Sequence, residues 1–188
     1  MNQEELIQEM LDEYADLKHQ QIQDRQELLQ EYVQKDCAEA IYLLGEEQLA
    51  DFPCGDTLEL FEEAAERGHA KARYRVGIMN EMERHLGGQE DPRMAYYHYI
   101  EAAKLGVTEA IYEIGRHYYE GLGVEQNYAK AVKYLELAAQ ENSPDAMYLL
   151  SECYAQGRGV QKDLEKALEY AQKAYTELKI KDKENILS

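Results

Sequence analysis

Apolar residues recur every three or four positions along most of the chain, which is the spacing of one buried side of an α-helix. From Ala110 to Tyr118 this spacing predicts a helix, and the glycines of segment 121–124 end it, because glycine accepts the left-handed conformation of a C-terminal cap. Asn127 can cap a second helix, and Asp163 can cap its counterpart in the last copy of this pattern. The predicted buried side of that helix consists of Ala131, Tyr134, Leu135 and Ala138. The pattern therefore predicts two antiparallel helices joined by a short loop.

This helix pair is one of several related copies. The alanine that begins it, Ala110, has counterparts at Ala40, Ala72 and Ala146, with spacings of 32, 38 and 36 residues along the chain. A second series consists of Ala64, Ala102, Ala138 and Ala174, with spacings of 38, 36 and 36 residues. Chance does not produce two series in constant phase, so we expect four repeats of about 36 residues.

Small residues interrupt the predicted helices at one fixed position of each repeat. These residues are Gly45, Gly77, Gly115 and Ser151. A glycine inside a helix costs about 1 kcal/mol relative to alanine. The recurrence of this cost predicts that a neighbouring helix approaches closely at each of these positions.

Several short motifs predict where helices begin. Asp91-Pro92 and Ser143-Pro144 each place a capping side chain before a proline that suits a first helical turn. Asp36 with Glu39, and Asp56 with Glu59, have the spacing of a capping box.

The N-terminal segment has a pattern of its own. Residues 3–35 contain no glycine or proline, and their two apolar stripes are separated by a nearly all-polar stretch from Lys18 to Arg25. We expect two helices, 3–18 and 24–35, with one bent helix as the alternative. Because a terminal repeat exposes an apolar face, the segment is predicted to cap the repeats; a coiled-coil or dimerising role is the alternative.

The repeat pattern resembles the Sel-1-like repeat family, a relative of the tetratricopeptide repeats. The shared motif is A-x-x-x-[LI]-G-x-x-Y-x-x-G-x-G-V-x-x-[ND]-x-x-x-A-x-x-Y-x-x-x-A-A. Residues 110–139 match it in full, and residues 146–174 match it apart from Ser151 and Tyr175. Residues 72–103 match with a longer loop at Gly87-Gly88, and residues 40–65 match loosely, so that about 140 of 188 residues are covered.

The resemblance implies an all-α fold, an alpha-alpha superhelix built as a right-handed solenoid of antiparallel helix pairs. We expect an N-terminal helical cap at 1–35 and four repeats over 36–178, followed by a tail at 179–188 that forms a frayed helix end. The expected repeats are approximately 36–68, 69–106, 107–142 and 143–178. The family consists of scaffolds, adaptors and inhibitors, so the resemblance indicates the fold more than an activity.

Composition narrows the choice of partner. Asp and Glu number 38 against 20 Lys and Arg, which gives a formal net charge of −18. This charge disfavours binding to nucleic acid and to anionic membranes. The N-terminus resembles no signal peptide, no apolar run is long enough for a membrane span, and the cysteines Cys37, Cys54 and Cys153 form no paired motif. A reducing cytoplasm is therefore the expected location.

No motif indicates catalysis, a metal or a cofactor. The pairs Gly121/Gly123 and Gly157/Gly159 follow predicted helices rather than strands and lack the third glycine of a nucleotide fingerprint. Glu113 shares a helix face with His117, but no second histidine lies four residues away, and the expected state of the five histidines is solvated or partly packed. We therefore expect no cofactor, no metal and no enzyme activity.

The tyrosines fall into two groups. One group, Tyr118, Tyr134, Tyr154 and Tyr170, occupies positions where packing is a sufficient explanation. The other, Tyr42, Tyr74, Tyr112 and Tyr148, lies at the edge of the buried stripe, which in tetratricopeptide-like solenoids faces the concave groove. We expect these four rings to form a ladder along that groove, with sealing of adjacent helices as the alternative. The further groove residues expected are Glu109, Arg116, Tyr119, Glu120, Asp145 and Glu152.

Aromatic rings beside carboxylates suit a basic protein or an extended basic peptide. The leading hypothesis is therefore a non-catalytic protein–protein interaction module that is a monomer or a weak homodimer. Two roles stay open for it, that of a bacterial immunity or inhibitor protein and that of an adaptor. The alternative is a scaffold that dimerises through its N-terminal helices, and an enzyme ranks third.

Overall fold

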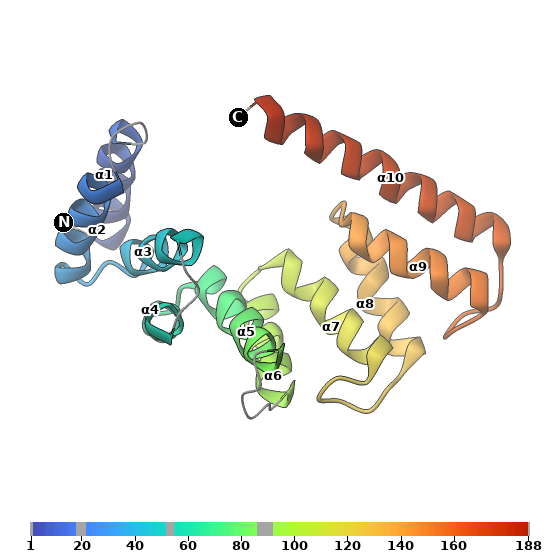
Figure 1. Cartoon of the computed structure of the whole chain (residues 1–188). Helices are drawn as coiled ribbons and strands as arrows, with labels where there is room; N and C mark the ends of the chain where they lie inside the picture. The colour runs from blue at the N-terminus through green and yellow to red at the C-terminus, as the bar shows by residue number, and fades with distance from the viewer. Residues whose placement is uncertain (1, 18–21, 52–54, 86–91, 188) are drawn as a thin grey trace. The chain divides into compact units, whose positions relative to one another are not determined.

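Every secondary-structure element that the structure describes is an α-helix. The computed structural model describes residues 2–17, 22–51, 55–85 and 92–187 (Figure 1). Its helices are α1 (Gln3–Asp16), α2 (Ile22–Gln34), α3 (Ala38–Asp51), α4 (Gly55–Glu66), α5 (Ala70–His85), α6 (Pro92–Lys104), α7 (Thr108–Glu120), α8 (Tyr128–Gln140), α9 (Pro144–Gln156) and α10 (Leu164–Leu187). The chain forms two compact units, Met1–Met79 and Asn80–Ser188, with the boundary inside α5.

In unit 1, the two N-terminal helices pack against α3. Their stripe residues Leu6, Met10, Leu29 and Tyr32 are buried together with Cys37, Ala40 and Leu44. The Tyr14 hydroxyl also donates to Glu47 on α3 at 2.6 Å. Helix α1 ends at Asp16 with Leu17 as its C-cap, and α2 begins at Ile22, so the described part of the segment forms two helices. Their apolar stripes are already covered within the unit.

In unit 2, each helix from α6 to α10 packs against the next one along the chain. One core cluster joins α8 to α9 through Val132 and Leu135 on one side and Leu150 and Cys153 on the other. Both alanine series are buried in the two units: their members are Ala40, Ala64, Ala72, Ala102, Ala110, Ala138, Ala146 and Ala174. The predicted phase of the repeats is therefore confirmed by burial.

The in-helix glycines lie where the prediction required a close neighbour. A Cβ atom at Gly45 would lie 2.8 Å from the ring of Phe61, and one at Gly115 would lie 3.0 Å from Leu135. Both distances are too short for an unshifted side chain, so the close approach is confirmed at these two positions.

The predicted caps are local features, and three of them form as expected. Asn127, Ser143 and Asp163 each accept a hydrogen bond from a backbone N–H in the first turn of the following helix. The capping box at Asp36 was wrong, because Asp36 has φ +61 in the turn after α2, and α3 begins only at Ala38. The capping box at Asp56 was wrong as well, because α4 begins at Gly55 and Asp56 already lies inside the helix. The predicted cap Asp91 and the loop at Gly87-Gly88 lie outside the described residues.

Candidate functional site

Helices α7 and α9 contact each other and place matched side chains one repeat apart. The matched pairs are Glu109 with Asp145, Tyr112 with Tyr148, and Arg116 with Glu152. We call the surface formed by these six residues together with Tyr119 and Glu120 the α7–α9 face. It contains all of the predicted groove residues of unit 2.

One half of the face is a hydrogen-bonded cluster between α7 and α9. Glu152 accepts from Tyr119 at 3.2 Å and from Tyr148 at 3.4 Å. Arg158 donates to the Tyr119 hydroxyl at 2.6 Å and lies 5.5 Å from the centre of its ring. Tyr148 still exposes 57% of its surface. The cluster therefore holds an exposed ring beside a carboxylate.

The other half centres on Arg116, whose charge is already paired. Its guanidinium lies 2.6 Å from Glu81, 2.8 Å from Glu113 and 3.4 Å from Glu120. Burial alone raises the pKa of Glu81, but hydrogen bonding to His117 and the charge of Arg116 hold it below its usual range. Burial raises the pKa of Glu113 despite Arg116. Arg116 therefore neutralises α5 and α7 carboxylates instead of adding positive charge to the face.

Tyr112 lies on α7, one turn before Arg116. Its half-buried ring packs against the α8–α9 core, and burial together with the negative charges of Glu113 and Asp145 raises the pKa of its hydroxyl to about 12. Glu109, Asp145 and Glu120 are exposed. Tyr112 is thus partly a packing residue, whereas Tyr148 is mainly a surface residue.

In unit 1 the corresponding tyrosine seals neighbouring elements. Tyr42 stacks on His69 with ring centres 4.3 Å apart, and His69 lies 2.8 Å from Glu39. Burial, followed by the charge of Glu46, raises the pKa of the Tyr42 hydroxyl. Tyr74, also in unit 1, is half-buried. A continuous ladder of four rings across both units stays a prediction.

His117 is fully buried, which corrects the expectation of a solvated or partly packed ring. Its Nδ1–H donates to the carbonyl of Leu122 at 2.7 Å, and its Nε2 lies 2.7 Å from Glu81. The position follows Ala110 by seven residues and Ile114 by three, so helical spacing already places it on the buried stripe. Glu81, its partner, lies 36 residues away and could not be recognised from sequence.

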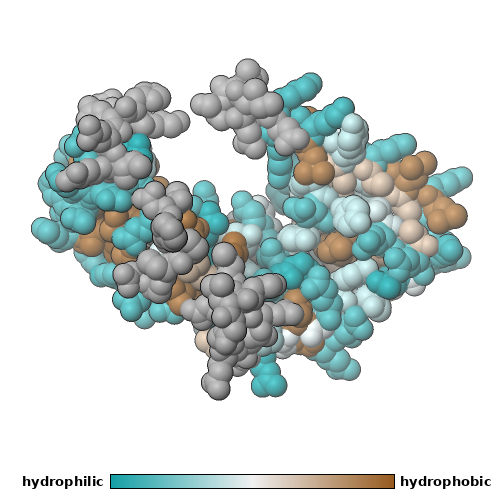
Figure 2. Space-filling view, viewed as in Figure 1, coloured by the Kyte–Doolittle hydropathy of each residue, from teal (hydrophilic) through white to brown (hydrophobic). Residues whose placement is uncertain are grey.

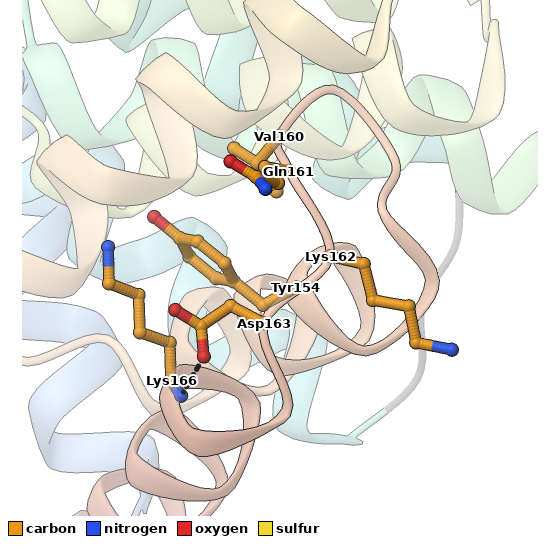
Figure 3. Close-up of a pocket in the computed structure, with 6 residues that line it drawn as sticks. All are labelled: Tyr154, Val160, Gln161, Lys162, Asp163 and Lys166. Atoms are coloured by element: carbon orange, nitrogen blue, oxygen red, sulfur yellow. Dashed lines mark hydrogen bonds between the residues drawn. The ribbon is translucent and has the colours of Figure 1, made fainter.

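The packing tyrosines also line surface clefts, which sequence reasoning missed. Tyr118 and Tyr134 stack with ring centres 5.8 Å apart and line a cleft of about 440 Å³ with Lys130, Lys133 and Leu137. The copy one repeat later, Tyr154 and Tyr170, stacks at 5.6 Å. Figure 3 shows the cleft beside Tyr154, where the Lys166 side chain runs alongside the ring.

The described residues offer little for catalysis or metal binding. Among them, no group of three or more His, Cys, Asp or Glu side chains could hold a metal ion. Cys153 is a buried free thiol whose pKa is raised to about 11, mainly by burial, so it is a poor nucleophile at neutral pH. No helix in the described part is both long and apolar enough to cross a membrane.

The repeats match a known family model. A model described as the Sel1 repeat matches residues 57–69, 70–107, 108–143 and 144–177, more than half of the chain. Chitin synthase regulatory factor 3 of Schizosaccharomyces pombe is 31% identical over 112 residues, which are 56% of this chain and 12% of that protein. DAP3-binding cell death enhancer 1 of Rattus norvegicus is 33% identical over 88 residues, which are 46% of this chain and 16% of that protein. The chain spans less than a fifth of either relative.

Solved structures share the fold. The protein c5321, a protective antigen of uropathogenic Escherichia coli strains with an SLR fold, gives a TM-score of 0.73 at 28% identity, covering 80% of this chain and 33% of its own. A Sel1 repeat protein from Oxalobacter formigenes gives 0.79 at 23% identity, covering 92% of this chain and 73% of its own. These likenesses confirm the predicted all-α superhelical fold.

Proposed function

The chain belongs to the Sel1 repeat family, and we propose that it is a non-catalytic module that binds a basic protein through the α7–α9 face. Sel1 repeat proteins generally mediate protein–protein interactions. The proposal for this chain adds the face that makes the contact and the charge of the partner.

The observation that carries the proposal is the exposed ring of Tyr148 among carboxylates. The ring exposes 57% of its surface and lies on the same face as Asp145 and Glu152. Exposed tyrosine rings contribute strongly to protein interfaces, because they bury a large apolar area while keeping a hydrogen-bonding group. An isolated exposed ring needs no explanation, but one in an acidic setting favours a cationic partner.

The charge of the face supports a basic partner. Two guanidinium groups, Arg116 of the face and Arg158 beside it, are outnumbered by the four carboxylates of the face, which are Glu109, Glu120, Asp145 and Glu152. Both guanidiniums already contact groups of the face, Arg116 through Glu120 and Arg158 through Tyr119. The uncompensated negative charge would steer a cationic partner, and raised salt would slow that association.

The N-terminal helices are proposed to cap the repeats. Their apolar stripes are buried against α3, which is what a cap requires. Dimerisation through the same stripes would need them to be exposed. A homodimer formed through α1 and α2 therefore has no support from these contacts. The roles of immunity protein or adaptor and the cytoplasmic location stay predictions.

The double substitution Tyr112→Ala with Tyr148→Ala tests the proposal. Because Tyr148 is exposed and Tyr112 half-buried, we expect the free energy of unfolding to fall by no more than about 1–2 kcal/mol. Affinity purification from the native host, quantified by mass spectrometry, should lose a specific partner whose recovery from wild type also falls with salt.

Tyr97→Ala is the matched control, since Tyr97 is 50% exposed on α6, outside the face. It should retain the partner. Loss of the same proteins from both variants, or loss of none, would contradict the proposed binding face.

A further inference from the structure

Helix α10 exposes a row of large apolar side chains. Leu164, Leu168, Tyr175 and Leu178 expose 64%, 60%, 60% and 48% of their surfaces. With the half-buried Ala171 their spacing is four, three, four and three residues, which is the a/d pattern of a helix that pairs with another helix. We call these five residues the α10 stripe. Figure 2 shows hydrophobic patches at the surface in the right-hand part of the view, where Figure 1 places α10.

The two central positions of the stripe are covered in the preceding repeat. Leu168 and Ala171 correspond, one repeat earlier, to Val132 and Leu135, which are buried in the core shared with α9. One repeat before that, the position of Ala171 is occupied by Tyr99, which is buried and contacts His117 of α7. The α10 stripe is therefore the kind of surface that receives another helix in this fold.

The charges beside the stripe indicate which helix it receives. On one side of the stripe, Ala167 and Ala174 are buried against α9. The other side is a charged flank. It begins with the exposed Glu165 and Glu169 and ends with the exposed Lys179 and Lys183. In an antiparallel pair of identical helices the acidic start of one flank meets the basic end of the other. In a parallel pair, the charged flank of each helix would instead face the side of its partner that already packs against α9.

The net charge of α10 also suits a second copy. Its residues carry five carboxylates and five lysines, whereas the chain as a whole has a formal charge of −18. Most of the protein surface therefore repels another copy, and α10 is locally neutral.

We infer that the α10 stripe is a homodimer interface, in which α10 pairs antiparallel with α10 of a second copy and Glu165 lies opposite Lys179. The interface is isologous, because each copy contributes the same residues. It differs from the alternative hypothesis of pairing through the N-terminal helices, whose stripes are buried in unit 1.

Sedimentation velocity of the full chain over a range of concentrations tests the interface. We expect a monomer–dimer equilibrium whose dissociation constant rises about tenfold or more in Leu168→Glu. Ile180→Glu is the matched control, because Ile180 is 44% exposed on another side of α10 and should leave dimerisation unchanged. A monomer at all concentrations, or equal weakening by both variants, would overturn the inference.

A charge exchange tests the orientation. Glu165→Lys and Lys179→Glu should each weaken the dimer about fivefold, since each places like charges opposite one another. The two changes together should restore wild-type affinity, because the exchanged charges again meet with opposite sign. Failure of this restoration would exclude the antiparallel pairing.

Discussion

Gly159 has φ +73, and its backbone lies against the first turn of α8. A Cβ atom there would lie 2.4 Å from the carbonyl of Tyr128. Gly123 makes the equivalent approach to Pro92 at the start of α6. The second glycine of each loop is therefore required because the preceding repeat leaves no room for a Cβ atom. The first glycine of the later loop, Gly157, is instead required by its left-handed conformation as C-cap of α9.

This difference predicts unequal effects of two similar substitutions. Gly157→Ala and Gly159→Ala meet the same positive φ, but a Cβ at position 157 would lie 3.3 Å from a side-chain atom of Lys162. We expect about 1 kcal/mol of destabilisation for Gly157→Ala, from backbone strain alone. Gly159→Ala should be destabilising by about 3 kcal/mol or more, because backbone atoms must move. Urea unfolding followed by circular dichroism measures both, and equal losses would contradict the close-contact explanation.

Single residues also show what the sequence could and could not predict. The caps Asn127 and Asp163 were predictable because each bonds within its own first turn. Asp36 has the same local pattern, but its backbone N–H donates to the carbonyl of Val33, so Asp36 belongs to the turn that follows α2. The burial of His117 could have been predicted from its helical spacing, whereas its pairing with Glu81 depends on packing between repeats.

At the scale of elements, polar side chains join the first helices of successive repeats. Glu81 of α5 contacts Arg116 and His117 of α7, and Tyr119 of α7 contacts Glu152 of α9. Within unit 1, Arg75 of α5 bonds to Glu46 of α3 through two nitrogens. Apolar contacts join helices within and between repeats, as the α8–α9 core shows, and these polar contacts add further links between the first helices.

The Glu81 contacts predict a pH-dependent contribution to stability. Because the folded pKa of Glu81 is lowered, its contribution is complete above the unfolded pKa of about 4.3 and is lost as pH falls through the folded value. Glu81→Gln should reduce the free energy of unfolding by about 1–3 kcal/mol at neutral pH. The difference from wild type should shrink in acid.

Chemical denaturation at neutral and acidic pH measures this difference. Glu120→Gln is the control, because Glu120 is exposed and contacts Arg116 at 3.4 Å. It should change stability by less than about 1 kcal/mol. A Glu81 effect that is the same at both pH values would show that charge is not its cause.

At the scale of the whole molecule, sequence predicted the fold class and the repeat phase because each repeat carries the same short-range pattern. Eight alanines of two series are buried as that phase requires. The partner-facing residues were harder to predict, because helical spacing places Tyr42 and Tyr148 at equivalent positions, yet Tyr42 stacks on His69 and Tyr148 is exposed. The neighbouring repeat decides which of the two states occurs.

The most direct test of the binding face is site-specific photo-crosslinking in the native host. The photoreactive residue p-benzoylphenylalanine replaces Tyr148 in one variant and Leu137, which is 49% exposed beside the Tyr118–Tyr134 cleft, in another. We predict a discrete crosslink to a protein with a basic surface from position 148 and none from position 137. A crosslink from position 137 alone, or from neither position, would contradict the proposal that the chain binds its partner through the α7–α9 face.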